Sequence, residues 1–317
     1  MAALVGAAAL GFNSALAQAY PAKPIHIIVP YPPGGSSDLL ARTLGTRLTS
    51  SLGQPVVVEN IAGAAGEVGV STAARRAPDG YTLLVTPNGA ITTGRFFKKQ
   101  PYDALVDLAP VAMLAEIQSV LAVNPSLPVN TLQEFVDYAR ARPGMLNYSS
   151  SGSASAHFLF AEILQYAAGI RLTSVPYKGA SPAALAVASG EVNAGVSDLT
   201  SFAPLKAAGK VRILATFNRR PPTRSPEIPA AADIVPGMMP IAGWIGVFAP
   251  AKTPAPIVAA LNREVNAIFA RPDVHEMLFS AGAEPAQPMS SEQFRGYIAE
   301  EVNTLDHLIK AAGVKLE

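Results

Sequence analysis

Strand-like and helix-like runs alternate in the first part of the chain, and this alternation restricts the fold more than any other feature. The runs with strand character are residues 25–29, 56–59 and 81–85. Helical segments begin near residue 38 and within residues 63–69. This βαβαβ order implies a mostly parallel sheet with helices on both faces. The same pattern returns between residues 145 and 215, which predicts a second α/β unit.

Two domains are expected from the length of the chain and from the order of its segments. Its 317 residues exceed the size at which a single core usually keeps growing. Helices predicted after residue 253 would pack back on the first unit, so the chain would cross twice between the domains. The expected limits are residues 20–122 plus 223–317 for the first domain and residues 123–222 for the second.

The first loop, residues 31–38, reads Tyr-Pro-Pro-Gly-Gly-Ser-Ser-Asp and lies between a predicted strand and a predicted helix. Its prolines lack an amide hydrogen, its glycines allow close approach to a ligand, and Asp38 can cap the helix. The free amides at the start of that helix, together with the helix dipole, would attract an anion. Taken alone, the segment is equally consistent with a tight βα connection.

The second loop, residues 149–155, reads Ser-Ser-Ser-Gly-Ser-Ala-Ser and also connects a strand to a helix. Its small hydroxyl side chains and its backbone amides are neutral hydrogen-bond donors. A flexible serine-rich linker is the alternative. Two loops of this kind, far apart in the chain, indicate two sides of one anion site.

Composition excludes several classes of function. The net charge is +1, from 24 basic and 23 acidic residues without a long run of either sign, so we expect no nucleic-acid partner. The absence of cysteine excludes disulfides and thiolate-bound zinc. The spacing Gly63-x-x-Gly66-x-x-Gly69 is not that of a dinucleotide fingerprint, and the histidines are scattered. We therefore expect no cofactor and no metal.

Residues 1–19 are expected to be a signal peptide or the remnant of one. Residues 1–17 are apolar and uncharged, and Ala15-Leu-Ala17 matches the small-x-small pattern that precedes a cleavage site. The basic start of such a signal is missing, so the chain could begin inside a longer precursor. A membrane anchor is the alternative, but it needs about twenty apolar residues. We expect an exported, soluble protein.

Several further motifs follow one another along the chain. They are Tyr20-Pro-x-Lys-Pro-Ile25, Val29-Pro-Tyr-Pro-Pro-Gly-Gly35 with Asp38, Val58-Glu-Asn-x-x-Gly63, Pro78-Asp-Gly-Tyr-Thr-Leu83, Tyr148-Ser-Ser-Ser-Gly152, Val175-Pro-Tyr-Lys-Gly179, and Trp244 with Phe248-Ala-Pro-Ala-Lys-Thr-Pro254. Together they resemble the extracytoplasmic solute receptors of the tripartite tricarboxylate transporter family, the Bug receptors. The resemblance covers essentially all of the chain after residue 19.

The resemblance implies a two-domain, type II-like periplasmic-binding-protein fold, also called a Venus flytrap. It further implies a periplasmic, monomeric receptor without catalytic residues, whose cleft holds a small carboxylate between the first and second loops. Its partner would be the two integral membrane subunits of a tripartite tricarboxylate transporter. The ligand could be a di- or tricarboxylate, an aromatic carboxylate or an amino acid.

The resemblance also implies a set of ligand-binding residues. Matching the motifs residue by residue gives Pro33, Gly34, Gly35 and Ser36 in the first loop and Ser150, Ser151, Gly152, Ser153 and Ala154 in the second. The expected set also includes the flanking residues Tyr31, Asp38, Ser155 and His157. Asn88, which follows a predicted strand, and Asp198 would contact the far end of the ligand. Asn88 could equally be a turn residue, Asp198 could cap a helix, and Tyr177 could stack on the ligand or support the hinge.

A serine-dependent hydrolase acting on a small carboxylate ester is the alternative function. Ser151, Ser153 or Ser155 could act with His157. The G-x-S-x-G motif is absent, however, and a histidine close in sequence is not thereby oriented on the serine. We therefore expect no catalytic residue.

Overall fold

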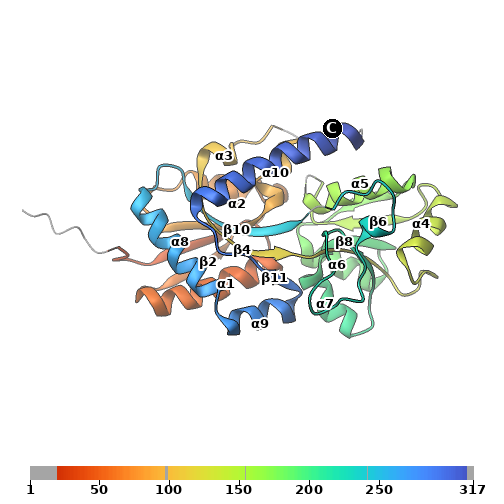
Figure 1. Ribbon diagram of the computed structural model, residues 1–317, viewed down its shortest axis with the longest axis horizontal. Helices are drawn as coiled ribbons and strands as arrows, with labels where there is room; N and C mark the ends of the chain where they lie inside the picture. The colour runs from red at the N-terminus through yellow and green to blue at the C-terminus, as the bar shows by residue number, and fades with distance from the viewer. Residues whose placement is uncertain (1–19, 97–98, 154, 241, 313–317) are drawn as a thin grey trace, which may run out of the picture.

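The computed structural model describes residues 20–96, 99–153, 155–240 and 242–312. These residues form two lobes, each built around one β-sheet flanked by helices, as the sequence predicts (Figure 1). The expected signal segment, residues 1–19, lies outside the described residues.

The sheet of the first lobe has the strand order β11-β4-β10-β3-β1-β2. Its strands are β1 (Ile25–Val29), β2 (Val56–Asn60), β3 (Thr82–Pro87), β4 (Leu108–Ile117), β10 (Gly243–Pro250) and β11 (Ala283–Pro285). Neighbouring residues of β1 face opposite sides of the sheet, as the two-residue period of a strand requires. Ile27 packs in the core that contains Leu44, whereas Ile28 packs in the core that contains Trp244.

The sheet of the second lobe has the order β7-β6-β8-β5-β9. Its strands are β5 (Ser119–Val123), β6 (Asn147–Ser150), β7 (Thr173–Pro176), β8 (Ala194–Asp198) and β9 (Arg212–Thr216). Here too the two faces bury separate cores. One core contains Leu121 and Phe160, and the other contains Val120 and Phe202.

Helices cover the faces of both sheets. In the first lobe they are α1 (Ser36–Leu52), α2 (Glu67–Ala74), α3 (Ala104–Asp107), α8 (Ala255–Phe269), α9 (Pro272–Ala281) and α10 (Ser291–Ala312). In the second lobe they are α4 (Leu132–Arg140), α5 (Ala156–Ala168), α6 (Ala180–Ser189) and α7 (Leu199–Ala207). The predicted capping box at α4 is present, since Thr131 Oγ1 accepts a hydrogen bond from Glu134 N at 3.1 Å.

Both sheets are mixed rather than mostly parallel. Strands β2 and β3 run parallel to β1, but β10 runs antiparallel to β3 and β4. In the second lobe, β6 is parallel to β7 and β8, whereas β5 is antiparallel to β8 and β9. The reason is the path of the chain, because β4 leads out of the first lobe and β10 leads back beside it.

The crossings between the lobes differ from the expected limits. Only Gln118 separates β4 of the first sheet from β5 of the second. After β9 the chain stays with the second lobe, where Val235 and Met238 are part of the core. We therefore place the first limit at Gln118 and the second after Met238, rather than at residues 122 and 222. Asn218 joins the first crossing to the returning chain: it accepts from Ser119 N and donates to Ile117 O, both at 3.1 Å.

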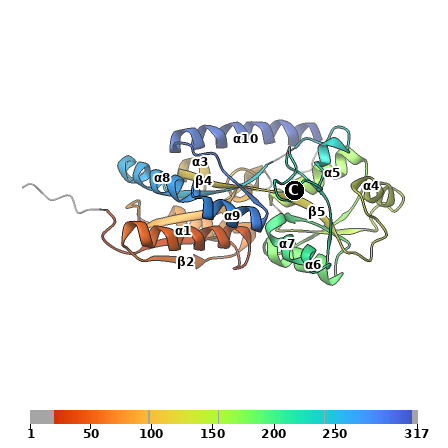
Figure 2. The ribbon, with the colours of Figure 1, turned by 60° about the horizontal axis from the view of Figure 1, so that its bottom comes forward.

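Helix α10 extends over both lobes, as the two views of the ribbon show (Figures 1 and 2). Near its start, Phe294 and Ile298 are buried beside Trp244 in the first lobe. Near its end, Leu305 and Ile309 are buried in the core of the second lobe. A single helix therefore contributes to the cores of both lobes.

No helix within the described ranges is both long enough and apolar enough to span a membrane.

Candidate functional site

A cavity of about 50 Å³ lies between the lobes. The first sheet contributes residues that follow β1, together with the last residue of β3 and those just after it, and the second contributes residues that follow β6 and β7 and the last residue of β8. The carboxyl ends of strands are the edge at which open α/β sheets bind ligands. In this conformation the cavity has room for only a few water-sized groups.

Four helices begin at the wall of this cavity. Their N-cap residues are Gly35 of α1, Ser155 of α5, Gly179 of α6 and Asp198 of α7, and all four line it. The first amides of a helix have no partner within the helix, and the helix dipole places partial positive charge there. Among the described residues, the wall contains no Lys or Arg. The wall therefore presents mainly neutral donors to an anion.

The first loop is held together by the carboxylate of Asp38. It accepts hydrogen bonds from Gly34 N at 3.1 Å, from Asn60 Nδ2 at 3.0 Å and from Arg42 Nε at 3.0 Å. Burial opposes the charge of Asp38, but these hydrogen bonds outweigh it and hold the pKa of Asp38 below its usual value. The amide of Gly34 is consequently engaged inside the loop.

The second loop is held together by hydroxyl groups. Ser155 Oγ caps α5 by accepting from Phe158 N at 3.2 Å, and it donates to Gly152 O at 2.7 Å. Ser150 Oγ also donates to Gly152 O, at 3.2 Å. Gly152 has a φ of 145°, which side chains rarely adopt, and a Cβ added there would lie 3.0 Å from Ala65 Cβ of the first lobe.

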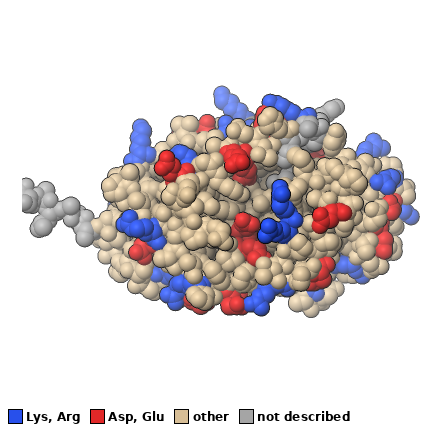
Figure 3. Space-filling view, viewed as in Figure 1, with Lys and Arg blue, Asp and Glu red and all other residues tan. Residues whose placement is uncertain are grey.

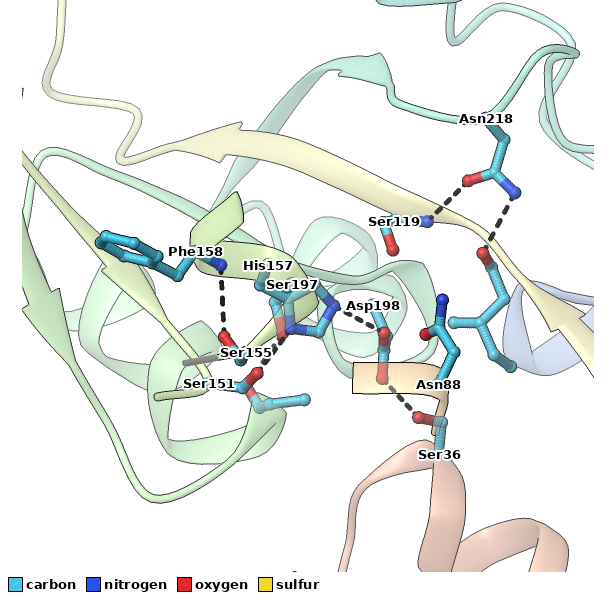
Figure 4. Close-up of polar contacts among 12 residues, drawn as sticks. Ser36, Asn88, Ser119, Ser151, Ser155, His157, Phe158, Ser197, Asp198 and Asn218 are labelled. Carbon is cyan, nitrogen blue, oxygen red and sulfur yellow. Dashed lines mark hydrogen bonds and ion pairs between the residues drawn. The ribbon is translucent and has the colours of Figure 1, made fainter. Parts of the chain in front are cut away.

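A line of hydrogen bonds crosses the cavity from one lobe to the other (Figure 4). Ser151 Oγ lies 2.7 Å from His157 Nδ1, and His157 Nε2 lies 2.9 Å from Asp198 Oδ1. The other oxygen of Asp198 accepts from Ser36 Oγ of the first lobe. Because a carboxylate only accepts, His157 Nε2 carries its hydrogen toward Asp198 and Nδ1 can accept from Ser151. This orientation of His157 on a serine was not expected from the sequence.

Asn88 connects the cavity to helix α10. Its Nδ2 donates to Glu301 Oε1 at 2.8 Å and to Ala242 O at 3.3 Å. Glu301 also accepts from Thr92 Oγ1 and from Trp244 Nε1. Burial raises the pKa of Glu301, although these hydrogen bonds oppose the shift. The amide nitrogen of Asn88 therefore connects this part of the cavity wall to α10.

Some of the predicted site residues line the cavity and others do not. Those that line the cavity are Tyr31, Gly35, Ser36, Asp38, Asn88, Ser151, Ser155, His157 and Asp198. Ser150 and Gly152 are buried but outside the lining, whereas Pro33, Gly34 and Ser153 are exposed. Tyr177 is also outside the lining and donates from its hydroxyl to Glu191 at 2.6 Å. Ala154 lies outside the described residues.

The start of α6 was not among the residues that the sequence placed in the site. Gly179, Ala180, Ser181 and Pro182 line the cavity, and the hydroxyl of Ser181 is buried without a hydrogen-bond partner among the described residues. The order Gly-Ala-Ser-Pro after a predicted strand is itself a helix-start signal, so this wall could have been found.

The lobes also approach each other closely at Gly89, which lines the cavity from the first lobe. A Cβ added to Gly89 would lie 3.1 Å from the backbone nitrogen of Ala156, at the start of α5 in the second lobe. Such a contact is tighter than ordinary van der Waals packing. A side chain larger than that of glycine would therefore press the lobes apart.

Neither a metal cluster nor a Lys or Arg of the described wall contributes to this site. In the described part of the chain, no group of three or more His, Cys, Asp or Glu side chains could hold a metal ion. Basic and acidic side chains are interspersed over the face seen in Figure 3. Attraction of an anion would thus be local to the cavity.

The chain is similar to known proteins over nearly its full length. The model of the tripartite tricarboxylate transporter family receptor matches residues 40–314. BugT of Bordetella pertussis is 35% identical over 303 residues, which cover 95% of this chain and 93% of BugT.

Solved structures agree in fold. R. palustris Rpa4515 with adipate has a TM-score of 0.89 and 32% identity, covering 93% of this chain and 98% of that one. MatC from Rhodopseudomonas palustris with bound malate has a TM-score of 0.86 and 29% identity, covering 92% of this chain and 100% of that one. The chain therefore belongs to the tripartite tricarboxylate transporter receptor family, whose members are solute-binding receptors and not enzymes.

Proposed function

We propose that this receptor binds a small carboxylate between its lobes, outside the cytoplasm, and delivers it to the membrane subunits of a tripartite transporter. The observation that carries the proposal is the convergence of four helix starts on a cavity whose described wall lacks Lys and Arg. Related receptors with adipate and with malate support the choice of ligand class.

The binding mechanism relies on neutral donors. Amides at the start of α1 and α5 would hold one carboxylate from opposite lobes, with Ser36 and Ser151 beside them. A hydrogen bond to a charged group contributes about 1.5 to 3 kcal/mol, and micromolar binding requires about 8 kcal/mol. A few such bonds therefore suffice, after the cost of ordering the ligand is met.

Closure of the lobes is the second part of the mechanism. A cavity of about 50 Å³ is too small for a dicarboxylate to enter unless the lobes part. Ligand would bind one lobe first, and closure would then bring the second lobe onto the same carboxylate. A ligand that binds the closed form stabilises the protein, and the stabilisation grows with the logarithm of the ligand concentration above Kd.

Thermal unfolding and calorimetry test the proposal directly. We expect at least one acid from a panel of succinate, adipate, malate, aspartate, citrate and benzoate to raise the Tm in a concentration-dependent way. Gly89→Val should lose this shift because the added side chain would meet Ala156 and prevent closure.

The matched control is Gly296→Val on the exposed face of α10, where a Cβ meets nothing within 4 Å. It should keep the ligand-induced shift. A protein that responds to none of the acids would contradict the carboxylate proposal. A full response in Gly89→Val would contradict closure as part of binding.

A further inference from the structure

The carboxylate of Asp198 lies in the cleft and does not cap a helix. Asp198 is the N-cap residue of α7, but its side chain makes no capping hydrogen bond there. It is 8% exposed and lines the cavity. Of the two alternatives left open by the sequence, the structure favours the one in which Asp198 faces the ligand.

The carboxylate of Asp198 lies beside the position proposed for the solute. His157 donates to it from Nε2, and Nδ1 of the same ring lies 2.7 Å from Ser151 Oγ. Ser36 donates to its other oxygen, and Tyr31, whose pKa is raised by burial and by the charge of Asp198, adds no cation. Asp38 also lines the cavity, but Arg42 and Asn60 already bind its carboxylate. Apart from His157, the described wall of the cavity offers Asp198 no basic side chain.

Two carboxylates would thus meet at Ser36. The amide of Ser36 belongs to the first turn of α1, where the proposed function places the solute carboxylate, and its hydroxyl contacts Asp198. A plain carboxylate would face Asp198 with no proton between them, which is unfavourable. A carboxylate oxygen pair has about four acceptor positions, so Asp198 can accept another donor besides Ser36 and His157.

We infer that Asp198 makes this receptor selective for acids that carry a hydrogen-bond donor, a hydroxyl or an ammonium group, on the carbon next to the bound carboxylate. The inference rests on the proposed function. The donor is placed on the adjacent carbon because Ser36 Oγ contacts Asp198 while the amide of the same residue would face the solute carboxylate. The solute hydroxyl or ammonium then donates to Asp198 while its carboxylate accepts from the helix starts.

The experiment compares matched pairs of acids by calorimetry. The pairs are succinate with malate, propionate with lactate, and phenylacetate with mandelate, and aspartate tests the ammonium group on the skeleton of succinate. In every pair that binds, the donor-bearing acid should bind about tenfold more tightly or better, as expected for a hydrogen bond to a charged group. A larger gain for aspartate than for malate identifies the ammonium group as the preferred donor.

Two variants separate selectivity from a structural role. In Asp198→Asn the preference should fall to about threefold or less, because the amide loses the charge and can donate to a plain carboxylate. In Ser36→Ala both members of a pair should weaken by a similar factor, since only the contact between the lobes is removed. A structural role for Asp198 would also weaken both members equally and leave their ratio unchanged.

Several results would overturn the inference. If the unmodified protein binds the two members of each pair equally, the inference is wrong, and no variant is needed to show this. An unchanged ratio of the two affinities in Asp198→Asn would also overturn the inference. Failure of every acid to bind instead removes the proposed function, and the inference with it.

Discussion

In the first loop a carboxylate makes the internal contacts, whereas in the second loop hydroxyl groups make them. Asp38 binds Gly34, Arg42 and Asn60, so the first loop is fixed by a charge that is balanced within its own lobe. In the second loop, Ser150 and Ser155 both bind Gly152 O. The two loops look alike in sequence, yet only the first depends on an ionised side chain for its shape.

The largest difference between the two loops is expected in the ligand affinity of variants that replace a glycine. Gly152→Val should reduce ligand affinity by about 100-fold or more, because the residue needs positive φ and its Cβ would press on Ala65 of the other lobe. Gly34→Val should cost only about tenfold, since the nearest atom to its Cβ, Ser181 Oγ, is 3.8 Å away. Isothermal calorimetry measures both.

Gly144→Val controls for backbone strain. Gly144 has a φ of 76°, and a Cβ there meets nothing within 4 Å. This variant should lower the Tm and leave ligand affinity unchanged. Equal losses of affinity in Gly34→Val and Gly152→Val would mean that contact between the lobes does not distinguish the loops.

The charge of the first loop should appear in the pH dependence of stability. At neutral pH, Asp38→Asn should lower the free energy of unfolding by about 1 to 3 kcal/mol, because three donors lose a charged acceptor. Hydrogen bonding lowers the pKa of Asp38 in the folded state, so the carboxylate stabilises the protein above its usual pKa. The gap between variant and unmodified protein should close as the pH falls through the lowered pKa.

Urea unfolding at a series of pH values measures this gap. Asp306→Asn, which removes only an exposed ion pair with Lys310 on α10, should change stability by a few tenths of a kcal/mol. A gap for Asp38→Asn that stays constant down to strongly acidic pH would show that its charge does not hold the loop.

The smallest effect is expected for the cap of the second loop. Ser155→Ala should cost about 1 kcal/mol of stability, with no pH dependence near neutrality, because the lost acceptor is a hydroxyl. Thr131→Ala removes the same kind of cap from α4, away from the cavity. Both should lower the Tm similarly, and only Ser155→Ala should weaken ligand binding. Identical affinities in the two variants would place the cap of α5 outside the binding machinery.

The features that depend on neighbouring residues in the chain were predictable from the sequence. The order of strands and helices follows from apolar periodicity, and the start of α4 follows from its capping box. The two loops were recognisable because two similar segments rich in glycine, proline or serine each join a strand to a helix. The family resemblance brought Ser36, Ser151 and Asp198 into the candidate site, and all three line the cavity.

Features that depend on contacts between distant residues were not predictable in the same way. The engagement of Gly34 N by Asp38 and the line from Ser151 through His157 to Asp198 arise from side-chain orientation. The first sheet is mixed because β10 returns beside β4, and the second because β5 enters it antiparallel to β8 and β9. A parallel βαβ pattern reveals neither. Asn88 was expected to face the ligand, but its amide nitrogen binds Glu301 of α10, which lies far away in sequence.

The position of α10 has a consequence for the resting state of the receptor. Separating the lobes must either uncover Leu305 and Ile309 or bend the helix that carries them. Each buried side chain of this size contributes about 1.5 to 3 kcal/mol, which would bias the unliganded protein toward the closed form. Small-angle scattering of Leu305→Ala should report a larger radius of gyration without solute. The open fraction, and hence the apparent affinity, could then be tuned from the last turns of the chain without altering any group that contacts solute.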